Sequence, residues 1–374
     1  MIYSTKKLGE ICEIQTGKWD ANHATKNGKY RFYTCAKEYA NCDTKRFSGE
    51  CLILPGNGVN VGEVFYYDGD FDAYQRTYVI SNITILPKYL YYHLFCYWNI
   101  RNANKQFGSA TNFLKIGNFL NYEISYPESL LEQRRIMKKL DQVFEKVTET
   151  KENMEKNLQN SKELFKSYLQ NVFANPGKNW EEKKLGDVLQ KTKTVDPAKK
   201  PNQEFIYIDV SSVNKETKNI ENVTPMKGKD APSRARKLVK MDDVIFATVR
   251  PTHSRVALVT KEYDGQVCST GYFVLRTTEV LNNKLVYYFL LTSDFNKQME
   301  KLQKGASYPA VTDGEVKNQI ISFPRSLSEQ KAIVKKLDTL STETKKLEVI
   351  YKQKLADLEE LKKSVLAKAF SVGL

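Results

Sequence analysis

An internal repeat is the feature that most constrains how this chain of 374 residues can fold. Three blocks return in the same order: KKLGE at 6–10 as KKLGD at 183–187, ISYPESLLEQ at 124–133 as ISFPRSLSEQ at 321–330, and IMKKLD at 136–141 as IVKKLD at 333–338. A repeat of this kind indicates a duplicated unit. We therefore expect the order globule, helix, globule, helix, which suits a target with two separated halves.

Two long helices are predicted at residues 130–173 and 327–370. Each follows a proline and opens with a Ser-x-x-Glu capping box, Ser129 to Glu132 and Ser326 to Glu329. Apolar residues then recur at alternating gaps of four and three, the spacing of a coiled-coil seam. The seam residues are Ile136, Leu140, Val143, Val147, Met154 and Leu164, and Ile333, Leu337, Leu340, Leu347, Tyr351, Leu358, Leu361 and Val365. Neither helix can bury its stripe alone, so we expect the two to pair as an antiparallel coiled coil.

The segments between the helices have mixed α/β character. Runs rich in β-branched and aromatic residues predict strands at 51–55, 61–67, 78–86, 244–251, 255–259 and 272–277, with short helices at 90–95 and 285–291. The fold class expected is α+β, with two related mixed α/β domains and two long paired helices. The boundaries are 1–127 for the first domain, 128–175 for the first helix, 176–324 for the second domain and 325–374 for the second helix.

Charge and composition narrow the class of protein. The formal net charge is +14, and a basic protein most simply meets a polyanion such as nucleic acid. The alternative is that the lysine excess only keeps the surface soluble. Six cysteines without a CxxC pair, and only three histidines, suit reduced thiols better than disulfides or zinc. No apolar run is long enough to span a membrane and no signal peptide is visible, so a cytoplasmic protein is predicted.

Sequence signatures of catalysis are missing. No GxxxxGK[ST] phosphate loop and no Asn/Asp-Pro-Pro-aromatic methyltransferase run occur. The glycine-rich segment 56–62 lies between two predicted strands, which is typical of a hairpin loop rather than of a dinucleotide cradle. His23, His93 and His253 do not assemble into a hydrolase triad. The chain is therefore predicted to be non-catalytic; a self-contained enzyme and a coiled-coil scaffold without DNA contact are the competing interpretations.

With these features the chain resembles the specificity subunits of type I restriction-modification systems. The carrying motifs are the three repeated blocks, together with GSAT at 108–111 and GASY at 305–308, and the resemblance covers essentially the whole chain. It implies that each globule is a target-recognition domain reading one half of a split DNA site, with the helices as a spacer. It also implies two modification subunits that methylate adenine with S-adenosylmethionine, and restriction subunits that use ATP and Mg. No cofactor is expected on this chain.

Loop residues aligned between the two copies are the candidates for DNA contact. The first region holds Asn57 and Asn60 against Arg250, Thr252, His253 and Arg255. The second holds Gln75 and Arg76 against Ser269 and Thr270, and the third Ser109, Thr111 and Asn112 against Ser307 and Tyr308. Arg, Asn and Gln suit bidentate contacts to bases. The basic residues Lys227, Lys229, Arg234, Arg236 and Lys237 suit phosphates. The alternative is that single residues cap turns and that the basic stretch is a solvated loop. Because the domains differ, we expect two different half-sites and an asymmetric full site.

Overall fold

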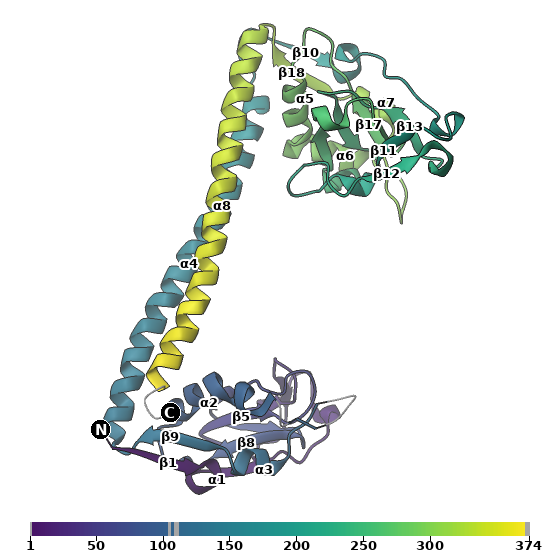
Figure 1. Cartoon of the computed structure of the whole chain (residues 1–374). Helices are drawn as coiled ribbons and strands as arrows, with labels where there is room; N and C mark the ends of the chain where they lie inside the picture. The colour runs from purple at the N-terminus through teal and green to yellow at the C-terminus, as the bar shows by residue number, and fades with distance from the viewer. Residues whose placement is uncertain (1, 104–105, 108–111, 371–374) are drawn as a thin grey trace. The chain divides into compact units, whose positions relative to one another are not determined.

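The computed structural model describes residues 2–103, 106–107 and 112–370 (Figure 1). It divides into two compact units. Unit 1 comprises Met1–Glu155 with Gln353–Leu374, and unit 2 comprises Lys156–Lys352. Helices α4 (Leu130–Ala174) and α8 (Leu327–Phe370) confirm both long helices predicted from the sequence, and each helix contributes to both units.

The repeated sequence blocks form the same framework in each unit. In unit 1, β1 (Tyr3–Lys7) pairs antiparallel with β9 (Glu123–Pro127), and Tyr3 lies opposite Pro127. In unit 2, β10 (Trp180–Lys184) pairs antiparallel with β18 (Ile320–Pro324), and Trp180 lies opposite Pro324. Each long helix follows the second strand of such a ribbon within a few residues. The duplicated blocks therefore encode the attachment of each globule to a helix.

Unit 1 holds two sheets and one principal helix beside this framework. One sheet has the order β2-β8-β5-β6 and the other β4-β3-β7. Their bounds are β2 (Glu13–Thr16), β8 (Thr77–Ser81), β5 (Glu50–Pro55), β6 (Phe65–Asp68), β4 (Ala40–Cys42), β3 (Tyr30–Tyr33) and β7 (Phe71–Ala73). The helices are α1 (Leu8–Ile11), α2 (Pro87–Asn102) and α3 (Ile116–Leu120), with a 3-10 turn at Ala21–His23. The main core joins α2 to Leu52 and Ile80 of the sheet, to Leu140 of α4, and to Leu366 and Phe370 of α8.

Unit 2 repeats this plan with more loop. Its sheets have the orders β12-β11-β16-β13 and β15-β14-β17. Their bounds are β12 (Thr224–Lys227), β11 (Glu204–Ile208), β16 (Val267–Ser269), β13 (Ala235–Leu238), β15 (Val256–Leu258), β14 (Val244–Ala247) and β17 (Tyr272–Leu275), and the helices are α5 (Asn283–Leu290), α6 (Ser293–Leu302) and α7 (Asp313–Lys317). Short 3-10 turns lie at Leu185–Val188, Pro197–Lys199, Val210–Ser212, Gly228–Asp230, Pro251–His253 and Lys261–Tyr263. The predicted strands at 244–251 and 272–277 are confirmed but shorter, and the predicted strand 61–67 begins only at Phe65.

The long helices pair antiparallel. In unit 1, Lys362 lies over the Phe144 ring at 5.4 Å, and Lys151 pairs with Glu359 at 2.7 Å, so residue numbers rise along α4 as they fall along α8. The predicted seam is wrong at three leucines, since Leu164, Leu347 and Leu361 are exposed. Buried Ser161 and Thr344 occupy inward positions instead. Their hydroxyls donate to the carbonyls of Asn157 and Leu340 on their own helices, so these small polar residues are buried with a hydrogen bond inside the same helix.

A buried glutamine joins each helix start to its globule. The Gln133 side-chain amide accepts the Leu86 N–H at 2.8 Å and donates to the Pro127 carbonyl at 2.7 Å. Gln330 accepts the Asn282 N–H at 2.7 Å and donates to the Pro324 and Val280 carbonyls at 2.7 and 2.9 Å. The capping serines are less alike. Ser129 accepts from the Glu132 N–H at 3.4 Å, whereas the Ser326 hydroxyl lies 2.7 Å from that of Ser328.

Replacing Gln330 with leucine is expected to lower the free energy of unfolding of unit 2 by about 2–4 kcal/mol. It leaves the half-buried Asn282 N–H and two carbonyls without the side-chain amide that bonds to them. Hydrogen exchange of peptides from α5 and β18 measures this loss. Lys331→Ala, at the exposed neighbouring position, is the control and should change stability by less than about 0.5 kcal/mol. Equal exchange in the two variants would contradict the assignment.

A buried histidine makes the stability of unit 1 depend on pH. His93 is packed against the rings of Tyr97, Tyr122 and Phe370. Its Nδ1 has no hydrogen-bond partner among the described residues. Burial, helped by the nearby Arg101 charge, lowers the pKa of His93 from 6.5 to about 3. The folded state therefore keeps this imidazole neutral where the unfolded chain binds a proton.

The depressed pKa of His93 contributes stability that is present above pH 6.5 and is lost as the pH falls toward 3. From pH 7 to pH 5.5 we expect unit 1 to lose about 1 kcal/mol through this group. His93→Leu removes the titrating group, so denaturant unfolding at the two pH values should show a smaller loss in the variant. Parallel losses in both proteins would contradict this prediction.

Candidate nucleic-acid interface

Three loops far apart in the sequence meet in unit 1. The Gly56 N–H donates to the Arg76 carbonyl at 2.9 Å, and the Gly58 N–H donates to the Asn112 carbonyl at 2.8 Å. Asn57 also pairs with Phe113 in an isolated bridge. A side chain at Gly56 would place its Cβ 2.4 Å from the Arg76 carbonyl oxygen, so glycine permits this approach. The first, second and third candidate regions therefore converge.

These loops surround a hollow of about 460 Å³ in unit 1. Asn57, Gln75, Arg76 and Lys115 are among its lining residues. The side chains of Gln75, Arg76 and Lys115 are exposed, and Asn57 is half-buried. The Gln75 amide donates to the Asp20 carboxylate. Arg76 and Lys115 thus present cationic donors at an open surface, the groups that contact phosphates and base edges.

The corresponding loops of unit 2 also meet. The Thr248 N–H donates to the Gly271 carbonyl at 2.8 Å, the Val311 N–H to the Thr248 carbonyl at 2.9 Å, and the Arg250 N–H to the Pro309 carbonyl at 2.7 Å. The same three regions are thereby joined as in unit 1. Each globule consequently presents one cluster of loops.

Backbone strain marks this cluster in unit 2. Arg250 and Ser254 adopt left-handed conformations with φ of 51° and 48°, each costing on the order of 1 kcal/mol for a residue other than glycine. The Arg250 guanidinium lies 5.0 Å from the centre of the exposed Tyr308 ring. Strain of this kind is concentrated at functional sites, where surrounding contacts hold it in place.

The candidate residues divide by exposure. The exposed ones are Gln75, Arg76 and Asn112 in unit 1, and Lys227, Lys229, Arg234, Arg250, His253, Thr270, Ser307 and Tyr308 in unit 2. Thr252 is half-buried and lines a second, larger hollow. Ser109 and Thr111 lie outside the described residues.

Other candidates are occupied within the protein. The Asn60 amide donates to the Cys35 carbonyl at 2.8 Å. Arg255 donates to the carbonyls of Ser211 and Val213. Ser269 is fully buried, and its hydroxyl accepts the Gly271 N–H at 3.2 Å. These side chains shape the loops from within, and Ser269 has no surface to offer a ligand.

The basic cluster adjoins the second candidate region of unit 2. Ala235 lies opposite Ser269 in the β13–β16 pair, and the Thr270 N–H donates to the Arg234 carbonyl at 2.8 Å. Two members of the cluster are neutralised, because Arg236 pairs with Asp196 at 3.4 Å and Lys237 with Asp313 at 2.8 Å. Lys227, Lys229 and Arg234 remain as exposed cations.

Sequence reasoning missed Lys115, which lines the unit 1 hollow with its ammonium 4.4 Å from the Phe107 ring centre. Its position four residues after the GSAT motif could have pointed to it. Trp19 was also missed. The Gln75 N–H donates to its carbonyl at 2.9 Å, so Trp19 lies beside the second candidate region.

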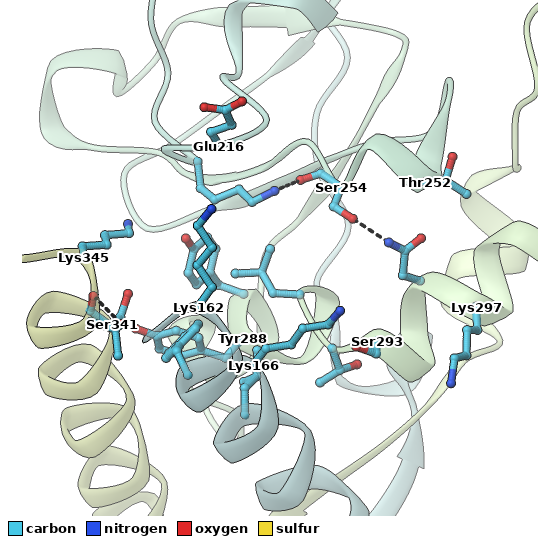
Figure 2. Close-up of a pocket in the computed structure, with 18 of the residues that line it drawn as sticks. Lys162, Lys166, Glu216, Thr252, Ser254, Tyr288, Ser293, Lys297, Ser341 and Lys345 are labelled. Carbon is cyan, nitrogen blue, oxygen red and sulfur yellow. Dashed lines mark hydrogen bonds between the residues drawn. The ribbon is translucent and has the colours of Figure 1, made fainter. Parts of the chain in front are cut away.

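A larger hollow of about 720 Å³ lies in unit 2 between the helices and the globule (Figure 2). Lys162 and Lys166 on α4 and Lys345 on α8 line it, together with Lys218. Burial, with the charges of Lys345 and Arg255, lowers the pKa of Lys218 to about 8. The Lys218 ammonium donates to the Ser254 carbonyl at 2.6 Å, so this lysine supports the strained Arg250–Ser254 turn.

The described residues contain no group of His, Cys, Asp and Glu side chains arranged to hold a metal ion. Among the helices of the described chain, none is sufficiently long and apolar to cross a membrane.

Comparisons with known proteins agree with this arrangement. The family model for the type I restriction modification DNA specificity domain matches residues 3–160 and 177–359, once for each copy of the repeat. The chain is 26% identical to the Escherichia coli type I restriction enzyme EcoDI specificity subunit over 98% of this chain and 88% of the relative. It is 24% identical to the Haemophilus influenzae type I restriction enzyme HindI specificity subunit over 41% of this chain and 34% of that protein.

A solved structure supports the fold. A chain from work on complex assembly and conformational transition of the type I R-M system aligns with a TM-score of 0.75 at 19% identity. The alignment covers 98% of the present chain and 97% of the solved one. At that identity the likeness establishes a shared fold along the whole chain.

Proposed function

The chain belongs to the type I restriction modification DNA specificity family, and from that premise we propose that it binds DNA sequence-specifically and reads a bipartite, asymmetric site. Each globule reads one half-site through its cluster of loops. Exposed cations hold phosphates and fix the register, while amide and guanidinium groups contact base edges. The candidate DNA-binding residues named from the sequence, except the fully buried Ser269, remain the proposal. Gln75, Arg76, Arg234 and Arg250 are among those with exposed side chains.

The observation that carries this proposal is the convergence of equivalent loops in both units. Three separated regions meet through backbone hydrogen bonds in each copy, so each globule presents one compact, polar surface. The two surfaces differ in chemistry. Unit 1 has exposed Gln75 and Arg76 at positions where unit 2 has buried Ser269 and exposed Thr270. Two different surfaces favour two different half-sites.

The chain carries no catalytic step in this proposal. Two modification subunits bind it and methylate adenine with S-adenosylmethionine, and restriction subunits supply ATP- and Mg-dependent translocation and cleavage. The chain itself holds no cofactor and works in the cytoplasm. The helices α4 and α8, which contribute to both units, set the gap between the half-sites.

A base-resolution methylation map of the host genome, with and without this gene, tests the proposal. We expect one split, asymmetric, adenine-methylated motif to disappear when the gene is deleted. Re-expression of the chain should restore the same motif. A map that stays unchanged in a host where the modification subunits are expressed and active would contradict the proposal.

A further inference from the structure

An exposed tryptophan is held rigidly beside the unit 1 loop cluster. Trp19 is 42% exposed. Its indole N–H nevertheless donates to a carboxylate oxygen of Asp72 at 3.1 Å. Asp72 lies in the middle of β7 and is only 1% exposed, so the anchor of this hydrogen bond belongs to the core. The hydrogen bond to this buried carboxylate therefore fixes the indole ring, while much of the ring surface faces solvent.

A second ring fixes the orientation of the indole. The His23 imidazole is stacked on Trp19 with centroids 4.1 Å apart and planes 3° from parallel. His23 Nε2 lies 2.8 Å from the Thr44 hydroxyl, and that hydroxyl donates to the Asp72 carboxylate at 2.7 Å. One buried carboxylate thus positions both rings, and the Phe32 ring makes an edge contact with His23 at 5.6 Å between centroids.

The backbone places this stack next to the residues that line the hollow. Trp19 bridges Tyr74, and the Gln75 N–H donates to the Trp19 carbonyl at 2.9 Å. Gly17 permits the close approach, since a Cβ there would lie 1.7 Å from the Ala73 carbonyl oxygen. The Trp19 backbone therefore adjoins Gln75 and the loop cluster proposed to read the first half-site.

The chemistry of the exposed surface limits what Trp19 can recognise. The only polar atom of the indole is already bonded to Asp72, so the exposed part is carbon alone. Among the base edges of the major groove, the apolar group is the C5-methyl of thymine. A rigid aromatic ring suits this contact because little conformational freedom is lost on binding.

We propose that Trp19 is a specificity-determining residue that packs against the C5-methyl group of one thymine in the first half-site; this inference rests on the proposed function. The second copy lacks the residue. Counting from the KKLG block, the corresponding position is Asp196, which pairs with Arg236. The contact is therefore specific to the half-site that unit 1 reads.

The test measures how tightly the complex of the full chain with its modification subunits binds DNA duplexes. These duplexes carry the motif that the methylation map identifies. Each thymine of the motif is replaced in turn by uracil, which keeps the base pair and removes only the methyl group. We expect one replacement, in the half-site read by unit 1, to weaken binding by about fourfold, the value of one buried methyl-sized group. Trp19→Ala should bind the thymine duplex about tenfold more weakly and should no longer distinguish thymine from uracil at that position. Trp19→Phe keeps a ring and should retain the distinction.

A second measurement does not depend on a variant that folds. A 5-iodouracil at the same position places a photoreactive iodine where the methyl group was. On irradiation we expect a crosslink that peptide mass spectrometry locates at Trp19 of the unaltered chain. A complex without any sequence preference would contradict the proposed function itself. A complex that reads its motif without a methyl-sensitive thymine, or with a crosslink elsewhere, would overturn the inference about Trp19 alone.

Discussion

Replacing Asp243 with alanine is expected to lower the free energy of unfolding of unit 2 by about 3–5 kcal/mol. It leaves the Arg276 guanidinium, whose side chain is only 18% exposed, without its carboxylate partner. Asp243 is 2% exposed. Its two carboxylate oxygens accept the Nε and Nη2 hydrogens of Arg276 at 2.8 and 2.7 Å, and one of them also accepts the Lys240 N–H at 2.8 Å. In the folded chain the bond to Asp243 raises the pKa of Arg276. When Asp243 is removed the guanidinium still keeps its charge, because arginine is not deprotonated in proteins.

The position of this pair explains why the loss should be felt across the unit. Asp243 immediately precedes β14 and Arg276 immediately follows β17. These two strands pair within the sheet β15-β14-β17. Hydrogen exchange of peptides from β14 and β17 reports the loss directly. Glu343→Ala breaks an exposed pair with Lys346 in the same unit and should cost at most about 1 kcal/mol. Similar losses in the two variants would contradict the argument.

Replacing Lys227, Lys229 and Arg234 together with alanine should weaken DNA binding on the order of 100-fold at about 0.1 M salt. It should also lower the slope of log K against log salt concentration by about 3. These three side chains are exposed, and no ion pair to them is seen in the described part of the chain. They are thus the members of the basic cluster that would contact phosphates without first breaking an ion pair within the protein.

The measurement is an anisotropy titration of a motif duplex at several salt concentrations. The matched control keeps each charge at its position: Lys227→Arg, Lys229→Arg and Arg234→Lys. This control should keep the slope near its original value. A slope that is unaltered by the three alanines would show that the cluster is a solvated surface, the interpretation left open by the sequence.

The framework of the fold was predictable because its signals are local. The Ser-x-x-Glu starts, the prolines before them and the repeated blocks predict helices α4 and α8 to within a residue, and the duplication predicts two related globules. The seam was less predictable. The heptad count placed Leu347 and Leu361 inward, whereas Thr344 is the buried residue in the structure. Its hydroxyl is satisfied by its own helix, an option that a count of apolar residues overlooks.

The candidate site was predictable at the level of regions. Alignment of the two copies identified loops that do converge, although their contacts are made between segments far apart in the sequence. Individual side chains were harder. Arg255 turns inward to the carbonyls of Ser211 and Val213, which no spacing in the sequence reveals. The anchored position of Trp19 could not be predicted for the same reason, because its partner Asp72 is 53 residues away in the sequence.

The composition of unit 1 has a consequence for how the chain is made. Phe370 of α8 packs against Tyr89 at 5.0 Å, and Tyr97 donates to the Ala367 carbonyl at 3.3 Å, so unit 1 needs residues from both ends of the described chain. Unit 2 is continuous in sequence. On the ribosome, residues 1–155 emerge first but cannot complete their core until residues 366–370 follow. The unit translated first is therefore finished last, and until then its apolar surface is available to chaperones.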